Sequence, residues 1–171
     1  IRVQISGRDG EARLFSRTGD EISHSFPDII MNFTGDAVLD GELLVVRDGD
    51  VAPFNDLQQR LNRKTVTKPM LSRFPAHIRL YDMLFADGED LGELPLEARR
   101  ARLEGWHASN ASERTDLSPL IETKSLEELQ QLWSSTREAG IEGLMLKRRT
   151  SPYLAGRPKG HWFKWKRAPL T

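Results

Sequence analysis

Along the first half of the chain, apolar and polar residues alternate in the way that is typical of half-buried β-strands. Short runs containing Asp-Gly, which favour tight hairpin turns, separate the alternating segments. The segment 37–46 (AVLDGELLVV) has so few polar positions that we expect it to be buried on both faces. The pattern predicts two hairpins and a further strand: 1–6 with 11–16, 37–46 with 51–54, and 77–85.

Two segments in the middle of the chain have helical spacing instead. In 94–106 (LPLEARRARLEGW), apolar side chains recur among charged ones, which predicts a surface helix. A shorter helix is predicted over 57–64, with Asn55 or Asp56 as its N-terminal cap.

The last third of the chain combines one helix with two strands. Ser-Leu-Glu-Glu at 125–128 is a capping box that opens a helix with an apolar face, and Gly140 closes it. Strands are predicted over 142–149 and 161–167, and the polar stretch 112–119 is predicted to be a loop. Strands outnumber helices and are joined by tight turns, which favours an α+β domain with largely antiparallel sheets over a doubly wound one.

Composition narrows the classes of protein without selecting one. The 171 residues suffice for one domain, and 25 basic residues balance 25 acidic ones, so a polyanion would need a local patch. The absence of cysteine excludes disulfides and suits a reducing cytosol. No apolar run approaches the ~20 residues of a membrane span, and the strand-like opening is unlike a signal peptide. Because the chain opens without Met, we expect further sequence before residue 1.

Basic and aromatic residues are interleaved near the end of the chain. If 161–167 is a strand, Lys164 and Lys166 share one face and Phe163 and Trp165 share the other. Two neighbouring cations repel each other, so this pair either grips a phosphate or belongs to a solvated strand edge. The basic residues of this region are Lys147, Arg148, Arg149, Arg157, Lys159, Lys164, Lys166 and Arg167.

Three acidic residues stand in or beside apolar strands. Asp40 and Glu42 lie inside the run that should be buried, where a carboxylate is costly unless it is paired, hydrogen-bonded or bound to a metal. Glu42 is the stronger candidate, with a tight-turn acid as the alternative. Glu142 precedes the apolar strand that ends at Lys147, and its carboxylate either holds a hard divalent cation or belongs to the surface.

Two further residues are candidates for ligand contact. Arg17 lies in a polar turn after a strand, as a solvent-facing residue or as a phosphate or sugar contact. Tyr81 alternates with core residues of its strand and offers either a core side chain or a stacking surface for a base.

Taken in order, these segments resemble the nucleotidyltransferase domain of ATP-dependent DNA ligases of the bacterial type. The superfamily also holds RNA ligases and mRNA capping enzymes. The resemblance spans essentially the whole chain and implies that residues 1–171 are a partial adenylation domain with an α+β nucleotidyltransferase (ATP-grasp-like) fold. The matching segments are Arg2, SRTG at 16–19, DGELLV at 40–45, LYDMLF at 80–85, EGLMLK at 142–147 and WFKWKR at 162–167.

The resemblance implies a reaction and its cofactors, ATP and Mg²⁺. A lysine amine attacks the α-phosphate of ATP, AMP passes to the 5′-phosphate of nicked double-stranded DNA, and the 3′-hydroxyl displaces AMP to seal the strand. The metal neutralises the charge that develops during phosphoryl transfer.

The resemblance also implies roles for individual residues. Glu42 and Glu142 would support the metal, and Glu42 would also contact the ribose. Tyr81 would stack on adenine, and Lys147 would belong to the nucleotide pocket. Lys164 and Lys166 would contact the α-phosphate, Arg2 would lie near the ribose and the 3′ end of the nick, and Arg17 would recognise the 5′-phosphate.

One departure from the family pattern is large. The first motif is Lys-x-Asp-Gly-x-Arg, and only its last two positions are present here, as Ile1 and Arg2. We therefore expect the nucleophilic lysine before residue 1 and the usual OB-fold domain after residue 171, so the 171 residues alone should not form lysyl-AMP. Partners would be nicked DNA and fused or associated repair domains, with no membrane, in the bacterial cytosol or nucleoid. The alternatives are an RNA ligase or capping-type enzyme, or a fragment that binds nucleotide or nicked DNA without catalysis.

Overall fold

A central seven-stranded sheet organises the computed structural model, which describes residues 1–139, 141–156 and 158–166. The strands follow the order β2-β1-β3-β5-β6, with β4 pairing β3 and β7 pairing β5. Their bounds are β1 (Arg2–Arg8), β2 (Glu11–Ser16), β3 (Ala37–Arg47), β4 (Asp50–Val51), β5 (Ala76–Ala86), β6 (Glu89–Asp90) and β7 (Thr115–Leu117). Among the described strands only β5 and β7 pair in parallel, so the predicted α+β class with largely antiparallel sheets is confirmed.

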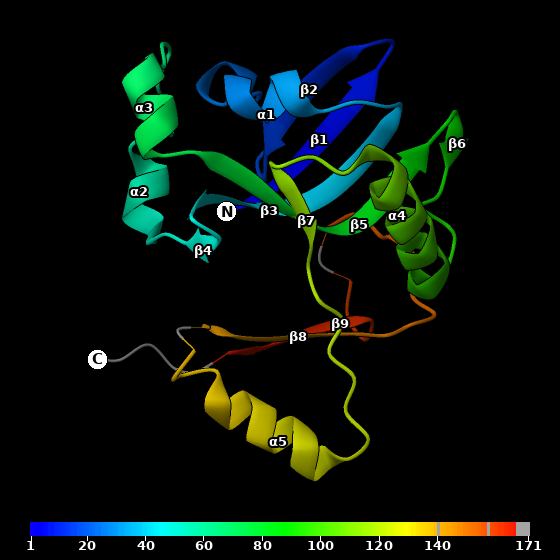
Figure 1. Cartoon of the computed structure of the whole chain (residues 1–171). Coiled ribbons are helices and arrows are strands. Elements are labelled where there is room, and N and C mark those ends of the chain that lie inside the picture. The colour runs from blue at the N-terminus through cyan, green and yellow to red at the C-terminus, as the bar shows by residue number, and fades with distance from the viewer. Residues whose placement is uncertain (140, 157, 167–171) are drawn as a thin grey trace.

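A second, two-stranded sheet of β8 (Gly143–Lys147) and β9 (Trp162–Lys166) lies between the central sheet and helix α5 (Leu126–Ser135), as Figure 1 shows. Trp165 of β9 stacks on Trp133 of α5 with ring centroids 5.1 Å apart. The second sheet is thus fastened to α5 on one side, and its other side is turned to the central sheet.

The predicted hairpins form, with one exception. The turn between β1 and β2 is Asp9–Gly10, where both residues have positive φ, as an Asp-Gly hairpin turn requires. The expected strand 51–54 is wrong beyond Val51, because Pro53 lacks the N–H that a ladder needs and begins helix α2 (Phe54–Gln58) instead. The expected loop 112–119 is wrong at residues 115–117, which add a strand beside β5.

The helices differ from prediction mainly at their ends. Helix α4 (Leu96–Asn110) and helix α5 were predicted, and Ser125 caps α5 by accepting from the Glu128 N–H at 3.1 Å. The predicted close of α5 at Gly140 lies outside the described residues, and the helix ends at Ser135. Neither Asn55 nor Asp56 caps α2, which begins earlier and ends at Gln58. Pattern alone did not predict the short elements η1 (Ser23–Ser25), α1 (Pro27–Asn32) and α3 (Lys68–Arg73).

One face of the central sheet forms the apolar core. Alternate residues of β3 and β5, including Leu43 and Ile78, are fully buried there, and α1, α2 and α4 cover them with Ile29, Leu57 and Leu103. Burial of both faces of β3 was predicted and is only half right, since the side chains on its second face are mostly partly exposed. That second face carries the candidate functional residues.

Candidate functional site

The second face of the central sheet is lined with charged side chains. Arg2 of β1 and Arg79 of β5 lie opposite Glu42 of β3 in the strand ladders. Side chains alternate along a strand, so Asp40 is on the same face as Glu42. Glu42 is partly exposed. This face therefore brings two of the predicted residues, Arg2 and Glu42, side by side.

Asp40 is the buried charge of this face, with 1% of its surface exposed. Its Oδ2 accepts hydrogen bonds from Arg2 Nη2 at 2.8 Å and from the Tyr153 hydroxyl at 2.6 Å, and its Oδ1 accepts from Gln4 Nε2 at 3.1 Å. These three donors compensate the cost of burying the carboxylate. Burial alone would lower the pKa of Arg2, but the hydrogen bond and charge of Asp40 raise it above its usual range.

Tyr81 projects from a β-bulge in β5. Asp40 pairs with Asp82 and Gly41 with Leu80, so Tyr81 is the extra residue of the ladder. The Nζ atom of Lys147 lies 4.5 Å from the centroid of the Tyr81 ring. Burial raises the pKa of the Tyr81 hydroxyl, which stays protonated at neutral pH. The bulge thus presents an aromatic ring to the second sheet, with a cation against it.

Lys147 is enclosed from two sides. Its Nζ atom lies 4.5 Å from the ring centroid of Trp162 as well as from that of Tyr81. Burial lowers the pKa of Lys147; Arg2 and Arg99 act in the same direction, and the charges of Asp82 and Asp40 oppose them. The amine therefore links β8, β9 and β5 through aromatic contacts.

The register of the second sheet places its lysines on one face. Lys147 pairs with Trp162, Met145 with Lys164 and Gly143 with Lys166, and directly opposite residues of an antiparallel pair share a face. Lys164 and Lys166 are exposed on the face from which Lys147 reaches Tyr81. The predicted separation of these lysines from Phe163 and Trp165 is confirmed by the register.

Two glycines in the motifs are explained by close packing between strands. A Cβ atom at Gly41 would lie 2.5 Å from Ile78 Cγ2 and 2.9 Å from the Arg79 carbonyl oxygen. A Cβ atom at Gly143 would lie 2.2 Å from the Trp165 carbonyl oxygen. Glycine at these positions lets the neighbouring strands approach, which holds Glu42 and Glu142 next to the ladders that carry the other candidates.

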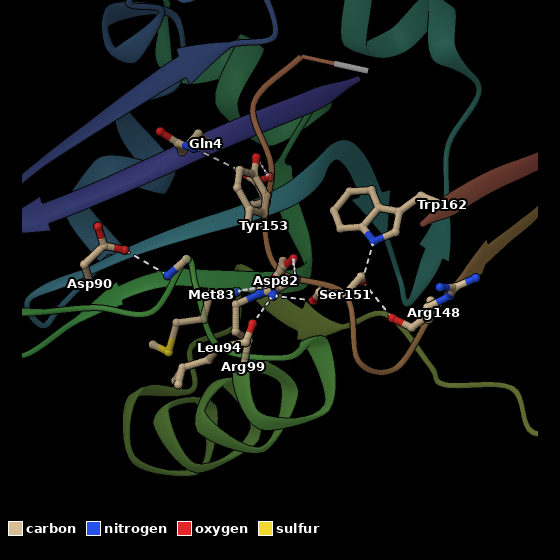
Figure 2. A network of polar contacts seen from close by, with 12 residues as sticks. Gln4, Asp82, Met83, Asp90, Leu94, Arg99, Arg148, Ser151, Tyr153 and Trp162 are labelled. Atoms are coloured by element: carbon tan, nitrogen blue, oxygen red, sulfur yellow. Dashed lines mark hydrogen bonds and ion pairs between the residues drawn. The ribbon is translucent and has the colours of Figure 1, made fainter. Parts of the chain in front are cut away.

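A fully buried ion pair joins Asp82, the residue after Tyr81 in β5, to Arg99. Arg99 of α4 donates to both carboxylate oxygens of Asp82, at 2.9 Å and 3.1 Å. Arg99 also donates to the carbonyl oxygens of Leu94 and Ser151, which fastens the segment after β8 to the central sheet (Figure 2). The prediction of a surface helix over 94–106 gave no sign that Arg99 points inward.

Arg17 and Glu142 lie at the edges of this arrangement, and both are exposed. Arg17 directly follows Ser16, whose ladder partner is Val3, so it lies beside the beginning of β1. Glu142 directly precedes β8. The structure therefore brings together Arg2, Glu42, Tyr81 and Lys147, with Lys164 and Lys166 on the face of the second sheet that Lys147 shares.

Sequence reasoning misjudged which acid is buried and missed one residue. The sequence pattern predicts Glu42 as the more costly acid, but Asp40 is the covered one and Glu42 is partly exposed, because Arg2 and Tyr153 bind Asp40. Tyr153 was not singled out. Its signal would have been an aromatic residue in the basic segment before β9, but its partners are more than 100 residues away in sequence.

The acidic residues of the site suit a hard cation only in part. Among the described residues, no group of three or more His, Asp or Glu side chains is arranged to hold a metal ion. Asp40 is already saturated with donors, whereas Glu42 and Glu142 are accessible carboxylates. Mg²⁺ is commonly bound by one or two carboxylates together with substrate phosphates. The accessible carboxylates alone therefore make no metal site among the described residues, and a phosphate ligand would have to complete one.

Residues 1–166 match the family described as ATP dependent DNA ligase domain, and the chain belongs to this family. The chain is 32% identical over 169 residues to a DNA ligase of Archaeoglobus fulgidus, covering 96% of this chain and 30% of that protein. It is 34% identical over 191 residues to a probable DNA ligase of Koribacter versatilis, covering 98% and 33%. The chain thus spans about a third of these curated relatives. The match confirms the predicted ligase family and favours it over the RNA ligase and capping alternatives.

Solved structures of ligases share the fold. The ligase domain of M. tuberculosis LigD superposes with a TM-score of 0.72 at 26% identity, over 96% of this chain and 51% of that one. Mycobacterial DNA ligase D complexed with ATP and MES gives a TM-score of 0.70 at 27% identity, over 96% and 50%. The fold is therefore that of the nucleotidyltransferase domain of ATP-dependent DNA ligases. None of the described helices has both the length and the apolar character needed to cross a bilayer.

Proposed function

We propose that this chain is the nucleotide-binding part of an enzyme that seals nicks in DNA with ATP through lysyl-AMP and DNA-adenylate. The observation that carries the proposal is the contact between two faces: the lysine-bearing face of the second sheet and the acid-bearing face of the central sheet. Lys147 of the second sheet lies against Tyr81 of the central sheet, and Arg2 and Glu42 line the same central face. Membership of the ligase family supplies the reaction.

The proposed roles are those that the family motifs imply, and the position of each side chain supports them. Tyr81 offers a ring face for adenine. Lys164 and Lys166 are exposed cations on the Lys147 face, suited to the α-phosphate and the departing pyrophosphate. Arg2 lies beside Glu42 for the ribose and the 3′ end of the nick. Arg17, exposed near the start of β1, is suited to the 5′-phosphate.

Glu42 and Glu142 are the proposed carboxylates for Mg²⁺, held together with the phosphates of ATP. A bound Mg²⁺ would neutralise charge on the reacting phosphate. The nucleophilic lysine of the family motif is not among residues 1–171, so the test requires the complete gene product. The proposed substrate is nicked double-stranded DNA. The proposed partners are repair domains that are fused to the chain or associated with it, and the proposed location is the cytoplasm.

The direct test is the intact mass of the complete protein before and after incubation with ATP and Mg²⁺. We expect the mass to rise by one AMP. Lys164→Ala or Lys166→Ala should slow this transfer by about 10²-fold without unfolding the protein, because each removes a donor to developing charge from an exposed position. Lys64→Ala, which removes an exposed lysine elsewhere, is the matched control. A complete protein that gains no AMP, or lysine variants that transfer it at the unmodified rate, would overturn the proposal.

A further inference from the structure

Tyr153 belongs to the segment after β8, yet its hydroxyl reaches the central sheet. We infer that Tyr153 is a positioning residue that holds the Arg2 guanidinium on Asp40 and away from Glu42, leaving the Glu42 carboxylate accessible to metal and nucleotide. The inference rests on the proposed function, and it adds a residue that neither the motifs nor the charge pattern single out.

The three polar groups form a closed triangle. The Tyr153 hydroxyl lies 2.6 Å from Asp40 Oδ2 and 2.6 Å from Arg2 Nη2, which itself lies 2.8 Å from Asp40 Oδ2. A hydroxyl has one proton, and Arg2 can only donate, so Tyr153 donates to Asp40 and accepts from Arg2. Burial and the neighbouring carboxylate raise the pKa of Tyr153, so this proton stays in place at neutral pH. The hydroxyl therefore contacts both members of the ion pair.

The rest of Tyr153 is held by contacts that do not involve its hydroxyl. Its backbone N–H donates to the Gly92 carbonyl oxygen at 2.8 Å. Its ring and that of Trp162 form a T-shaped pair with centroids 5.9 Å apart, and the Arg99 guanidinium lies 5.8 Å from the Tyr153 centroid. Figure 2 shows Tyr153 between β1 and Trp162. A phenylalanine would keep these contacts and remove only the hydroxyl.

Arg2 needs such a restraint because it has two acidic neighbours. The ladder places Glu42 directly opposite Arg2, and Asp40 accepts its hydrogen bond from the diagonal position. The Arg2 side chain is 42% exposed, and a long exposed side chain samples many rotamers. Without the Tyr153 hydroxyl, Arg2 can turn to Glu42 and neutralise a carboxylate that the metal needs. Errors of about 1 Å in a reacting group can cost about 10²-fold in rate.

The test compares Tyr153→Phe with Gln4→Met in the complete protein. Gln4 bonds the other oxygen of Asp40 at 3.1 Å, so Gln4→Met also removes one donor from the buried carboxylate but leaves Arg2 held. Two quantities are measured: the single-turnover rate of AMP transfer at saturating ATP, and the Mg²⁺ concentration that half-saturates binding of α,β-methylene-ATP, followed by calorimetry. The second readout does not depend on turnover.

We expect Tyr153→Phe to slow AMP transfer about tenfold or more and to raise the Mg²⁺ midpoint, whereas Gln4→Met stays within about twofold of the unmodified protein in both. Equal losses in the two variants would show that Tyr153 merely supports Asp40 and would overturn the inference. An unchanged rate and midpoint in Tyr153→Phe would overturn it as well. Failure of the unmodified protein to take up AMP would instead defeat the proposed function and this inference with it.

Discussion

The Lys147 amine lies 4.5 Å from the ring centroid of Tyr81 and 4.5 Å from that of Trp162, so one cation bridges the two sheets. Tyr81 belongs to the central sheet, and the other two residues are opposite each other in the second sheet. The contact therefore sets the spacing between the two faces that the proposed reaction uses.

Replacing the Lys147 amine should weaken nucleotide binding with little change in the free energy of unfolding. Desolvation of the Lys147 charge costs stability, as its lowered pKa indicates, whereas the aromatic contacts repay ~0.5–2 kcal/mol. We therefore expect Lys147→Met to change the free energy of unfolding by less than ~1 kcal/mol, because these effects oppose each other. Loss of a cation from the proposed pocket should weaken α,β-methylene-ATP binding by about tenfold, or ~1.4 kcal/mol.

Urea unfolding and calorimetric titration would measure the two effects. Lys64→Met changes an exposed lysine in the same way and should leave both quantities unchanged. Unaltered analogue affinity in Lys147→Met would remove Lys147 from the proposed pocket while leaving its structural contacts intact.

A second buried ion pair lies in the first half of the chain, and it includes none of the candidate site residues. Arg60, fully buried, donates to both oxygens of Asp28 at 2.6 Å and 2.8 Å, and the Ala76 N–H donates to Asp28 Oδ2 at 3.0 Å. Asp28→Asn leaves a buried guanidinium without its counter-charge. We expect the free energy of unfolding to fall by ~3–5 kcal/mol, measured in urea.

An exposed ion pair provides the control for Asp28→Asn. Glu89 and Arg102 lie 3.1 Å apart with roughly half of each side chain exposed. Glu89→Gln should therefore change the free energy of unfolding by ~0–1 kcal/mol. Similar losses in the two variants would mean that burial of the Asp28–Arg60 pair has little energetic weight.

The sequence could predict the strands and the residues on their faces because alternation is a local property. The sequence correctly placed Lys164 and Lys166 on one face of β9 and Phe163 and Trp165 on the other face. It also located the Asp-Gly turn after β1 correctly. The register between strands is not local. Whether Asp40 or Glu42 is covered depends on Tyr153, which arrives from another part of the chain.

Short elements escaped prediction for a related reason. The strand β7 has three residues and no apolar alternation. It pairs with β5 through backbone hydrogen bonds, and Arg79 of β5 also binds Asp116 through two nitrogens. Helix α1 has six residues, too few for a helical period to be visible in sequence. In both cases tertiary contacts, rather than local preference, decide the structure.

Gly143 should be intolerant of any side chain. The Cβ atom of Gly143→Ala would lie 2.2 Å from the Trp165 carbonyl oxygen, so β8 and β9 would have to separate. We expect faster amide hydrogen exchange in 143–147 and 162–166, with the strands of the central sheet unchanged. Gly105→Ala is the control: it lies within α4 with open space around its Cα, so it should stabilise the protein by ~1 kcal/mol. Protected exchange in the Gly143→Ala second sheet would contradict the close approach of its strands.

The Arg79–Asp116 pair should stabilise the fold in a pH-dependent way. Burial would raise the pKa of Asp116, but the hydrogen bond from Arg79, together with the charges of His77 and Arg79, lowers it below its ordinary value of 3.8. Because the folded carboxyl has the lower pKa, its stabilisation is fully present above pH 3.8 and is lost as the pH falls through the folded pKa. The side chains of Arg79 and Asp116 are 35% and 41% exposed, so solvent screens the pair and its contribution is ~1 kcal/mol or less.

Asp116→Asn should therefore unfold at a lower urea concentration than the unmodified protein at pH 7, and the difference should shrink as the pH falls towards 3. Asp50→Asn, an exposed change in β4, gives the baseline for removing one acidic charge. A difference between Asp116→Asn and the unmodified protein that stays constant or grows on acidification would mean that Asp116 stabilises β7 through its shape or its hydrogen bonds, and not through its charge.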